Sequence, residues 1–171
     1  MLVRPTKAHE ADALGYIQEH RAVGEAHLHG ASSLEKKPTY DDWLLHLERQ
    51  SHADTVEPGW VPSTTLFAVG KTDGRIVGVI DIRHHLNDFL ASYGGHIGYG
   101  VRPCERRKGY AAEMLRLGLQ TCKTLGLERV MLTCNKDNIA SAKTIIGQGG
   151  ILEREHVHTD GETIQIYWIT L

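Results

Sequence analysis

The sequence predicts an α/β (α+β) fold, in which a mixed, mostly antiparallel sheet carries helices on both faces. Stretches with apolar residues at helical spacing alternate with β-rich runs bounded by Gly, Pro and Asp, and the predicted order is β-α-α-β-β-β-α-β-α-β-β. The 171 residues suit one domain of ordinary size, and no internal repeat divides them. We therefore expect a single domain over residues 1–171.

The first part of the chain supplies one strand and two helices. The run LVRPT over 2–6 is a short strand, and the spacing of apolar residues predicts a helix over 10–22. A second helix is expected over 39–50, with Thr39 as its N-cap and two aspartates in its first turn. Pro and Gly in the loop-like stretch 51–63 then end this helix.

The middle of the chain changes to the period of strands. Two β-rich runs over 64–70 and 75–83 flank the residues KTDG, which are typical of a hairpin turn. A further strand is expected over 94–101, where four of the eight residues in GGHIGYGV are glycine. These three runs predict neighbouring antiparallel strands.

The last part of the chain returns to helices and closes with strands. The helix predicted over 109–125 has the clearest pattern, with apolar residues along one side and charged or polar residues along the other. Two consecutive glycines, Gly149 and Gly150, stop the helix that follows. The elements expected here are a helix over 109–125, a strand over 129–135, a helix over 138–148, and strands over 151–157 and 163–171 around an Asp160-Gly161 turn.

The overall composition excludes several classes of protein. Hydrophobic residues make up 41% and charged residues 23%, as in a globular domain, and a net charge of −2 argues against a nucleic-acid partner. The three cysteines have no CxxC spacing, so neither a disulfide framework nor a zinc ribbon is expected. No apolar run is long enough for a membrane span or a signal peptide, and we expect a cytoplasmic protein with no membrane contact.

The charge is distributed unevenly along the chain. Residues 100–148 hold nine Lys or Arg against four Asp or Glu, whereas residues 21–63 hold four against seven. The first region is therefore suited to an anion, and the second is mildly acidic.

The most unusual stretch is VRPCERRKGYAAEML, residues 101–115. Its three consecutive cations, residues 106–108, precede Gly109 and the start of a helix, although helix N-termini normally attract acidic side chains. A helix N-terminus also carries unpaired N–H groups, and a glycine lets a ligand approach the backbone. We therefore expect a strongly negative group such as a pyrophosphate here; the alternative is a solvated charge cluster that Glu105 partly neutralises.

This stretch resembles the acetyl-CoA segment of the GNAT (GCN5-related) N-acetyltransferases. Arg106-x-x-Gly109-x-Ala111 fits the R/Q-x-x-G-x-G/A signature of that superfamily. The strand before it, the helix after it and a downstream Asn138-x-x-Ser141 stand in the family's order, and the resemblance covers nearly the whole chain. It implies a GNAT-type sheet with one splayed pair of strands.

The resemblance implies a binding site for acetyl-CoA that uses backbone as much as side chains. In such enzymes the loop amides hold the pyrophosphate, and the preceding strand bulges, here at 98–100, where a backbone N–H polarises the thioester carbonyl. The residues assigned to the co-substrate in this way are Tyr99, Gly100, Val101, Arg106, Arg107, Lys108, Gly109, Tyr110, Ala111, Asn138 and Ser141.

The catalytic groups are less clear from the sequence. Many family members carry a tyrosine acid where this chain has Ile145, so the proton for the departing thiolate must come from elsewhere or from solvent. His96 is the candidate base, because it starts the strand that would carry the acetyl group and imidazole titrates near neutrality. Asn135, at the end of the other splayed strand, is a second candidate catalytic residue.

The expected reaction is direct transfer of the acetyl group from acetyl-CoA to an amine. Asp81, His84 and His85 follow a strand expected to border the acceptor, where they either bind it or begin a polar loop. The acidic region over 21–63 favours a cationic acceptor, such as a polyamine, an aminoglycoside-like compound or an amine of a protein.

Two other readings stay open. The same fold could bind an acyl-CoA as a sensor without turnover, or use a longer acyl chain. A homodimer is common in the family and is possible here. No metal is expected, because His27-x-His29 and His156-x-His158 lack an accompanying ligand frame.

Overall fold

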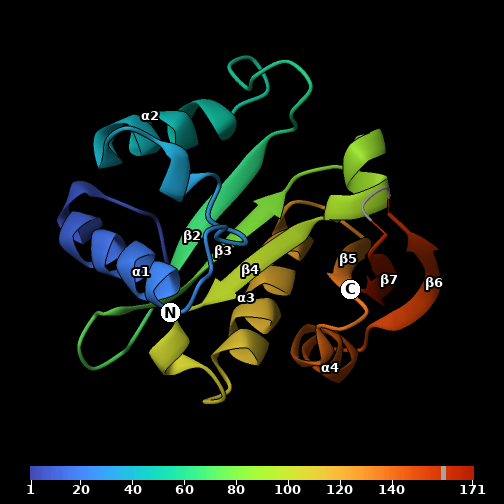
Figure 1. Ribbon diagram of the computed structural model, residues 1–171. Coiled ribbons are helices and arrows are strands. Elements are labelled where there is room, and N and C mark those ends of the chain that lie inside the picture. The colour runs from blue at the N-terminus through green and yellow to red at the C-terminus, as the bar shows by residue number, and fades with distance from the viewer. Residues whose placement is uncertain (159–160) are drawn as a thin grey trace.

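The computed structural model describes residues 1–158 and 161–171, in the element order that the sequence predicts (Figure 1). Its strands form two antiparallel sheets, and helices lie against them. This arrangement confirms the predicted fold class. Asp160, in the predicted Asp160-Gly161 turn, lies outside the described residues.

The first sheet has the order β1-β2-β3-β4, and every neighbouring pair is antiparallel. The first strand is shorter than predicted, since Pro5 has no N–H to continue a ladder. The strands are β1 (Leu2–Val3), β2 (Ser63–Val69), β3 (Ile76–Arg83) and β4 (Ile97–Val101).

Helices cover both faces of this sheet (Figure 1). On one face, α1 (Glu10–Ala22) and α2 (Tyr40–Gln50) bury Phe67 and Val79 in a core that also holds Trp43. On the opposite face, α3 (Tyr110–Thr124) packs on the alternate residues of β3, such as Ile80. The period of two along β3 therefore feeds two cores.

Helix α2 begins as the sequence predicts. Thr39 is its N-cap, and the Thr39 hydroxyl accepts a hydrogen bond from the Asp42 N–H at 3.1 Å. Asp42 in turn accepts from the Thr39 N–H at 3.2 Å, which completes a reciprocal capping box.

The second sheet has the order β5-β7-β6, so the last strand in the sequence lies in the middle. Helix α4 (Ile139–Gly147) connects β5 to β6 and packs on the same core as α3. The strands are β5 (Arg129–Asn135), β6 (Ile151–Val157) and β7 (Thr163–Thr170).

The two sheets meet where β4 begins. The His96 N–H donates to the Met131 carbonyl at 2.7 Å, and the Met131 N–H donates to His96 Nδ1 at 2.9 Å. Beyond this point the described part of the chain shows no strand pairing between β4 and β5, and Figure 1 shows β4 running away from β5. The splayed pair of strands expected from the family is therefore present.

The predicted strand over 94–101 begins three residues late. Residues Leu90–Gly94 form a short π-helical turn, and Gly95 turns the chain with a φ of +64°. A Cβ on Gly95 would lie 2.6 Å from the Met131 carbonyl oxygen, so glycine is required where the chain passes β5. Each helix in the described residues is too short or too polar to cross a membrane.

Candidate active site

The edge of β4 that faces β5 carries free backbone groups. Hydrogen bonds from the Arg83 N–H to the His96 carbonyl (2.8 Å) and from the Arg102 N–H to the Val77 carbonyl (2.9 Å) fix the phase of the β3–β4 ladder. Backbone groups alternate between the two edges of a strand. The N–H and C=O groups of Tyr99 and Val101 therefore point away from β3.

The glycines of β4 allow another backbone segment to pack closely on the strand, and they do not form the predicted bulge. The β3–β4 register runs without a shift from Ile97 to Val101, so the bulge expected at 98–100 is wrong. Instead, the backbone of residues 29–30, between α1 and α2, lies directly on β4. A Cβ on Gly100 would lie 2.8 Å from the His29 carbonyl oxygen, and one on Gly30 would collide with the Gly98 carbonyl.

The loop between β4 and α3 exposes a run of backbone N–H groups. Arg107 and Gly109 have φ angles of +63° and +84°, and left-handed residues of this kind direct successive N–H groups toward one side. In the described chain the N–H groups of residues 107–112 have no hydrogen-bond acceptor. Free donors at the positive end of a helix dipole favour an anion.

The three cations of this loop differ in their partners. Arg106 holds Glu25 through two hydrogen bonds of 2.8 and 2.6 Å, and its Nε donates to the Val101 carbonyl at 3.2 Å. Lys108 lies 3.0 Å from Glu105, as the charge-cluster alternative proposes. Arg107 makes no ion pair with any described residue. Glu25 belongs to the segment after α1, so the loop is tied to that segment.

His20 of α1 also contacts the Arg106–Glu25 pair. The hydrogen bonds from Arg106 lower the pKa of Glu25 to about 2, so Glu25 is ionised at neutral pH. His20 Nδ1 lies 2.7 Å from the same carboxylate. Burial lowers the pKa of His20, which favours a neutral ring.

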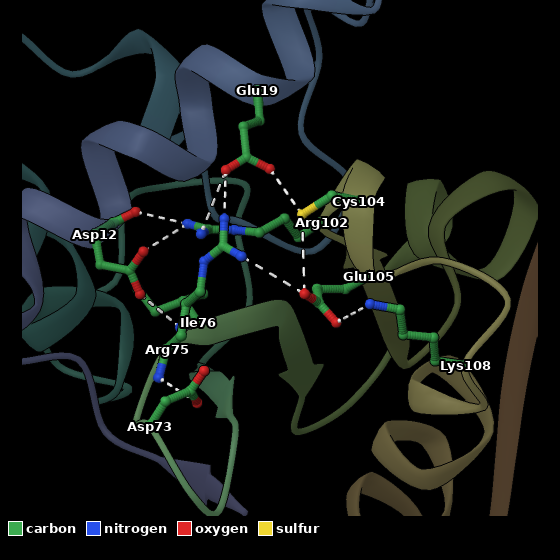
Figure 2. A network of polar contacts seen from close by, with 9 residues as sticks. All are labelled: Asp12, Glu19, Asp73, Arg75, Ile76, Arg102, Cys104, Glu105 and Lys108. Carbon is green, nitrogen blue, oxygen red and sulfur yellow. Dashed lines mark hydrogen bonds and ion pairs between the residues drawn. The ribbon is translucent and has the colours of Figure 1, made fainter.

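A buried arginine anchors the start of the loop to α1 (Figure 2). Arg102, whose side chain is 2% exposed, donates to the carbonyl and the carboxylate of Asp12 at 2.9 and 2.7 Å. Its other terminal nitrogen lies 3.5 Å from Glu19. Figure 2 shows the network continuing through Arg75, Cys104, Glu105 and Lys108.

His96 is placed for a structural role. It is buried, and its Nδ1 lone pair is occupied by the Met131 N–H. Burial lowers the pKa of His96 to about 4, and the nearby charge of Arg83 acts in the same direction. A neutral ring that accepts at Nδ1 carries its proton at Nε2. This geometry leaves His96 no free lone pair with which to act as the base expected from the sequence.

The asparagines and the serine surround the start of α4. Asn138 is the helix N-cap, and its Oδ1 accepts from the Ser141 N–H at 3.0 Å. The Ser141 hydroxyl lies 3.1 Å from the Tyr99 hydroxyl, which reaches α4 from β4. Asn135 donates to Glu162 at the end of β5, four residues beyond the Met131 that contacts the start of β4.

The three predicted acceptor residues have different environments. Asp81 is buried, ion-paired with Arg83 at 2.7 Å and hydrogen-bonded by the Thr65 hydroxyl. His84 shares a hydrogen bond of 2.9 Å with Thr64, and burial lowers its pKa. His85 is exposed. Only His85 is therefore free to meet a ligand directly.

Sequence reasoning missed the residues that tie α1 to the loop. Glu25 and Arg106 are 81 positions apart, and Asp12 and Arg102 are 90 apart. No local pattern links such residues, although Arg102 stands directly before Pro103 and the loop. The Tyr99 hydroxyl was also missed, because the motif draws attention to the Tyr99 backbone.

The comparison with protein families matches this geometry. Residues 1–150 match the family model described as an acetyltransferase (GNAT) domain. The chain belongs to the GNAT acetyltransferase family. No curated protein matches the sequence.

Solved structures share the GNAT fold at low sequence identity. The ribosomal-protein-S5-alanine acetyltransferase of Vibrio fischeri has a TM-score of 0.75 and 16% identity, covering 99% of this chain and 91% of its own. A spermidine N-acetyltransferase (SpeG) mutant of Vibrio cholerae has a TM-score of 0.68 and 12% identity over 99% and 94%. The Salmonella typhimurium protein yncA, solved with acetyl-CoA, has a TM-score of 0.65 and 14% identity over 100% and 93%.

Proposed function

We propose that this GNAT protein transfers the acetyl group of acetyl-CoA directly to a primary amine, within a complex that holds both substrates. The observation that carries the proposal is the free edge of β4, which leads into a loop of unpaired N–H groups and cations at the start of α3. An extended arm with an anionic end would match both parts of this surface.

The residues present fit acetyl-CoA. The N–H groups of residues 107–112 would hold the pyrophosphate, with Arg107 and Lys108 attracting the phosphates. The N–H and C=O of Tyr99 and the N–H of Val101 would pair with the amides of the pantetheine arm and with the thioester carbonyl, whose developing negative charge such N–H donors stabilise; the Val101 C=O already accepts from Arg106. The co-substrate would supply an activated acetyl group.

The acidic composition of residues 21–63 supports a cationic acceptor. Within this region Glu25 is already held by Arg106, however, so the charge that remains for an ammonium group comes from other carboxylates of the region. Two structural relatives are named for the acetylation of spermidine and of the alanine of a ribosomal protein, and both acceptors are amines. These are the first acceptors to test.

Ligand-dependent thermal stability tests the donor. Acetyl-CoA or CoA at 100 times its Kd should stabilise the protein by about 2.7 kcal/mol, whereas ATP should stabilise it much less. Stabilisation by ATP alone would contradict the proposal. The release of CoA thiol is then measured with and without an amine acceptor. A faster release with the amine distinguishes an enzyme from a sensor that binds acetyl-CoA without turnover.

Two matched glycines test where the pyrophosphate binds. Gly109 and Gly126 lie just before and just after α3, with φ of +84° and +81° and open space around each. Alanine at either position should cost about 1 kcal/mol of backbone strain. Only Gly109→Ala should also weaken acetyl-CoA binding, by tenfold or more in calorimetry; equal affinities in the two variants would place the pyrophosphate elsewhere.

A further inference from the structure

We infer that His27 is the base that takes the proton of the acceptor ammonium, and that Glu35 positions its ring. This inference rests on the proposed function and names the acceptor side of the same site. Both residues lie in the segment between α1 and α2, and His27 Nδ1 lies 3.1 Å from Glu35 Oε1.

His27 is exposed and Glu35 is buried, as expected of a base and the carboxylate that orients it. The His27 side chain is 60% exposed, whereas that of Glu35 is 4% exposed. A carboxylate at Nδ1 fixes the ring and its tautomer and leaves Nε2 as the lone pair that meets substrate. The ring is therefore available to an acceptor, and the carboxylate is shielded from water.

Three other His–Glu pairs seen among the described residues lack this arrangement. In two of them the ring is buried and the carboxylate is exposed, which prevents contact with a substrate. In the third both side chains are exposed, so nothing fixes the ring. The exposed fractions of imidazole and carboxylate are 4% and 39% for His20–Glu25, 6% and 55% for His46–Glu57, and 65% and 73% for His52–Glu48.

The segment that carries the pair lies on the strand where the acetyl group would be held. The carbonyl of His29, two residues after His27, packs against Gly100, and Gly30 packs against the backbone of Gly98 and Tyr99. These contacts leave no room for a side chain at Gly100 and little at Gly98. The pair is therefore held on the α1–α2 face of β4, from which an acceptor would approach.

Two unfavourable features are concentrated in the same segment. Glu35 Oε2 is buried with no hydrogen-bond partner among the described residues. Ser32 and Ser33, adjacent to it, both have left-handed backbone, with φ of +47° and +62°. Unpaired buried groups and left-handed non-glycine residues each lower stability and are found disproportionately at functional sites. Such unfavourable features are expected where a buried carboxylate is kept in place to orient the ring of a neighbouring histidine.

The titratable groups around the pair are few. The His29 ring lies 4.8 Å from the His27 ring, edge to face. Burial lowers the pKa of His29, and His27, Glu25, Glu35 and His20 act on it electrostatically. On the facing surface of β4 the Arg83 guanidinium lies beside Gly98, because a Cβ there would lie 3.2 Å from its terminal nitrogens and 3.4 Å from Gly30 Cα. Within the described chain no three His, Cys, Asp or Glu side chains gather as metal ligands.

The proposed step balances as follows. His27 Nε2 takes one proton from the ammonium group, and the freed nitrogen lone pair forms the C–N bond at the acetyl carbonyl. The C–S bond breaks with its electron pair on sulfur. An acid beside the sulfur protonates it and is reprotonated by the second proton that nitrogen must lose, and His27 releases its proton to solvent.

His27→Ala and a control variant test this assignment, with spermidine and a peptide bearing an N-terminal alanine as acceptor probes. His27→Ala should lower kcat about 100-fold while the Kd of acetyl-CoA changes less than twofold. Added imidazole should restore part of the rate, which a merely structural defect would not allow. His52→Ala, the matched exposed histidine, should have wild-type activity.

Glu35 requires a separate readout because it acts through His27. Glu35→Gln should lower kcat about tenfold and displace the acidic limb of the kcat–pH profile, and Glu35→Asp should recover part of the loss. Wild-type activity in His27→Ala, an unchanged profile in Glu35→Gln, or acetyl-CoA binding without acetylation of either probe would overturn the inference. Failure of wild-type protein to bind acetyl-CoA would instead overturn the proposed function.

Discussion

The hydroxyl groups of Tyr99 and Ser141 lie 3.1 Å apart between β4 and α4. Burial raises the pKa of Tyr99, so its hydroxyl keeps its proton at neutral pH. Ile145, where the family resemblance implies a tyrosine acid in many members, is buried in the core that Tyr99 packs against. Tyr99 thus places a protonated hydroxyl beside α4, the helix that carries Ile145.

A phenylalanine at position 99 isolates this hydroxyl. Tyr99→Phe keeps the ring and should lower kcat about 100-fold with acetyl-CoA, because the departing thiolate then lacks a nearby acid. An acetyl thioester with a strongly acidic leaving thiol should show little loss, since that thiolate needs no proton. The measurement is thiol release with both donors.

Tyr167→Phe is the matched control. Tyr167 is buried in the same core, but its hydroxyl donates to Gln165 at 2.8 Å. This variant should keep wild-type rates with both donors. An equal loss with both donors in Tyr99→Phe would indicate a packing defect rather than a missing acid.

At the scale of elements, α1 and the loop before α3 form one unit. Arg102 connects them from a buried position, and a lysine there has a single ammonium group that cannot bridge Asp12 and Glu19 in the same way. Arg102→Lys should lower the free energy of unfolding by about 1–3 kcal/mol and weaken acetyl-CoA binding about tenfold. Urea unfolding and calorimetry measure the two effects.

The control for this change is another arginine with a carboxylate partner. Arg116 pairs with Glu113 on the exposed side of α3. Arg116→Lys should leave both quantities unchanged, because exposed pairs contribute little. If Arg102→Lys loses stability but keeps its acetyl-CoA affinity, Arg102 does not set the loop geometry.

Removing the charge of Glu25 from its pair with Arg106 should raise the affinity for acetyl-CoA. A carboxylate held by Arg106 occupies a cation that the pyrophosphate would otherwise attract. Glu25→Gln should therefore tighten acetyl-CoA binding about threefold at low salt, with the gain fading at high salt. Glu113→Gln breaks a similar two-bond pair on α3 and should not change the affinity; a loss of affinity in Glu25→Gln would contradict the competition.

The elements themselves were largely predictable because local chemistry decides them. Thr39 and the two aspartates specify the start of α2, and Gly149 and Gly150 follow the end of α4. The site was predictable only where a local motif carries it, as in the loop over 106–109. The role of His96 was not, because its Nδ1 partner is a backbone group of another sheet.

The whole molecule should lose stability as the pH falls below neutrality. Burial lowers the pKa of His20, His46, His84 and His96, the last to about 4 from an ordinary value of 6.5. Below pH 6.5 the unfolded chain binds protons that the folded chain does not, so stability rises with pH between about 4 and 6.5. His96 alone should account for about 2 kcal/mol between pH 7 and pH 5.

Urea unfolding at pH 7 and pH 5 measures this dependence. His96→Asn offers an amide oxygen in place of Nδ1 to the Met131 N–H, and it has no group that titrates in this range. The variant should therefore lose less stability on acidification than wild type. An identical loss in both proteins would assign the pH dependence to the other histidines.

The central place of β7 in the second sheet has a consequence for synthesis. Until the ribosome has added residues 163–170, both β5 and β6 lack the strand that joins them, and their inner edges have no partner. Such unpaired edges are the feature of a nascent chain most prone to associate with other chains. β5 is also one strand of the splayed pair that it forms with β4. The proposed acetyl-CoA site would therefore be incomplete on a growing chain. Under the proposed function, any stabilisation by acetyl-CoA therefore begins only after β7 has joined the second sheet.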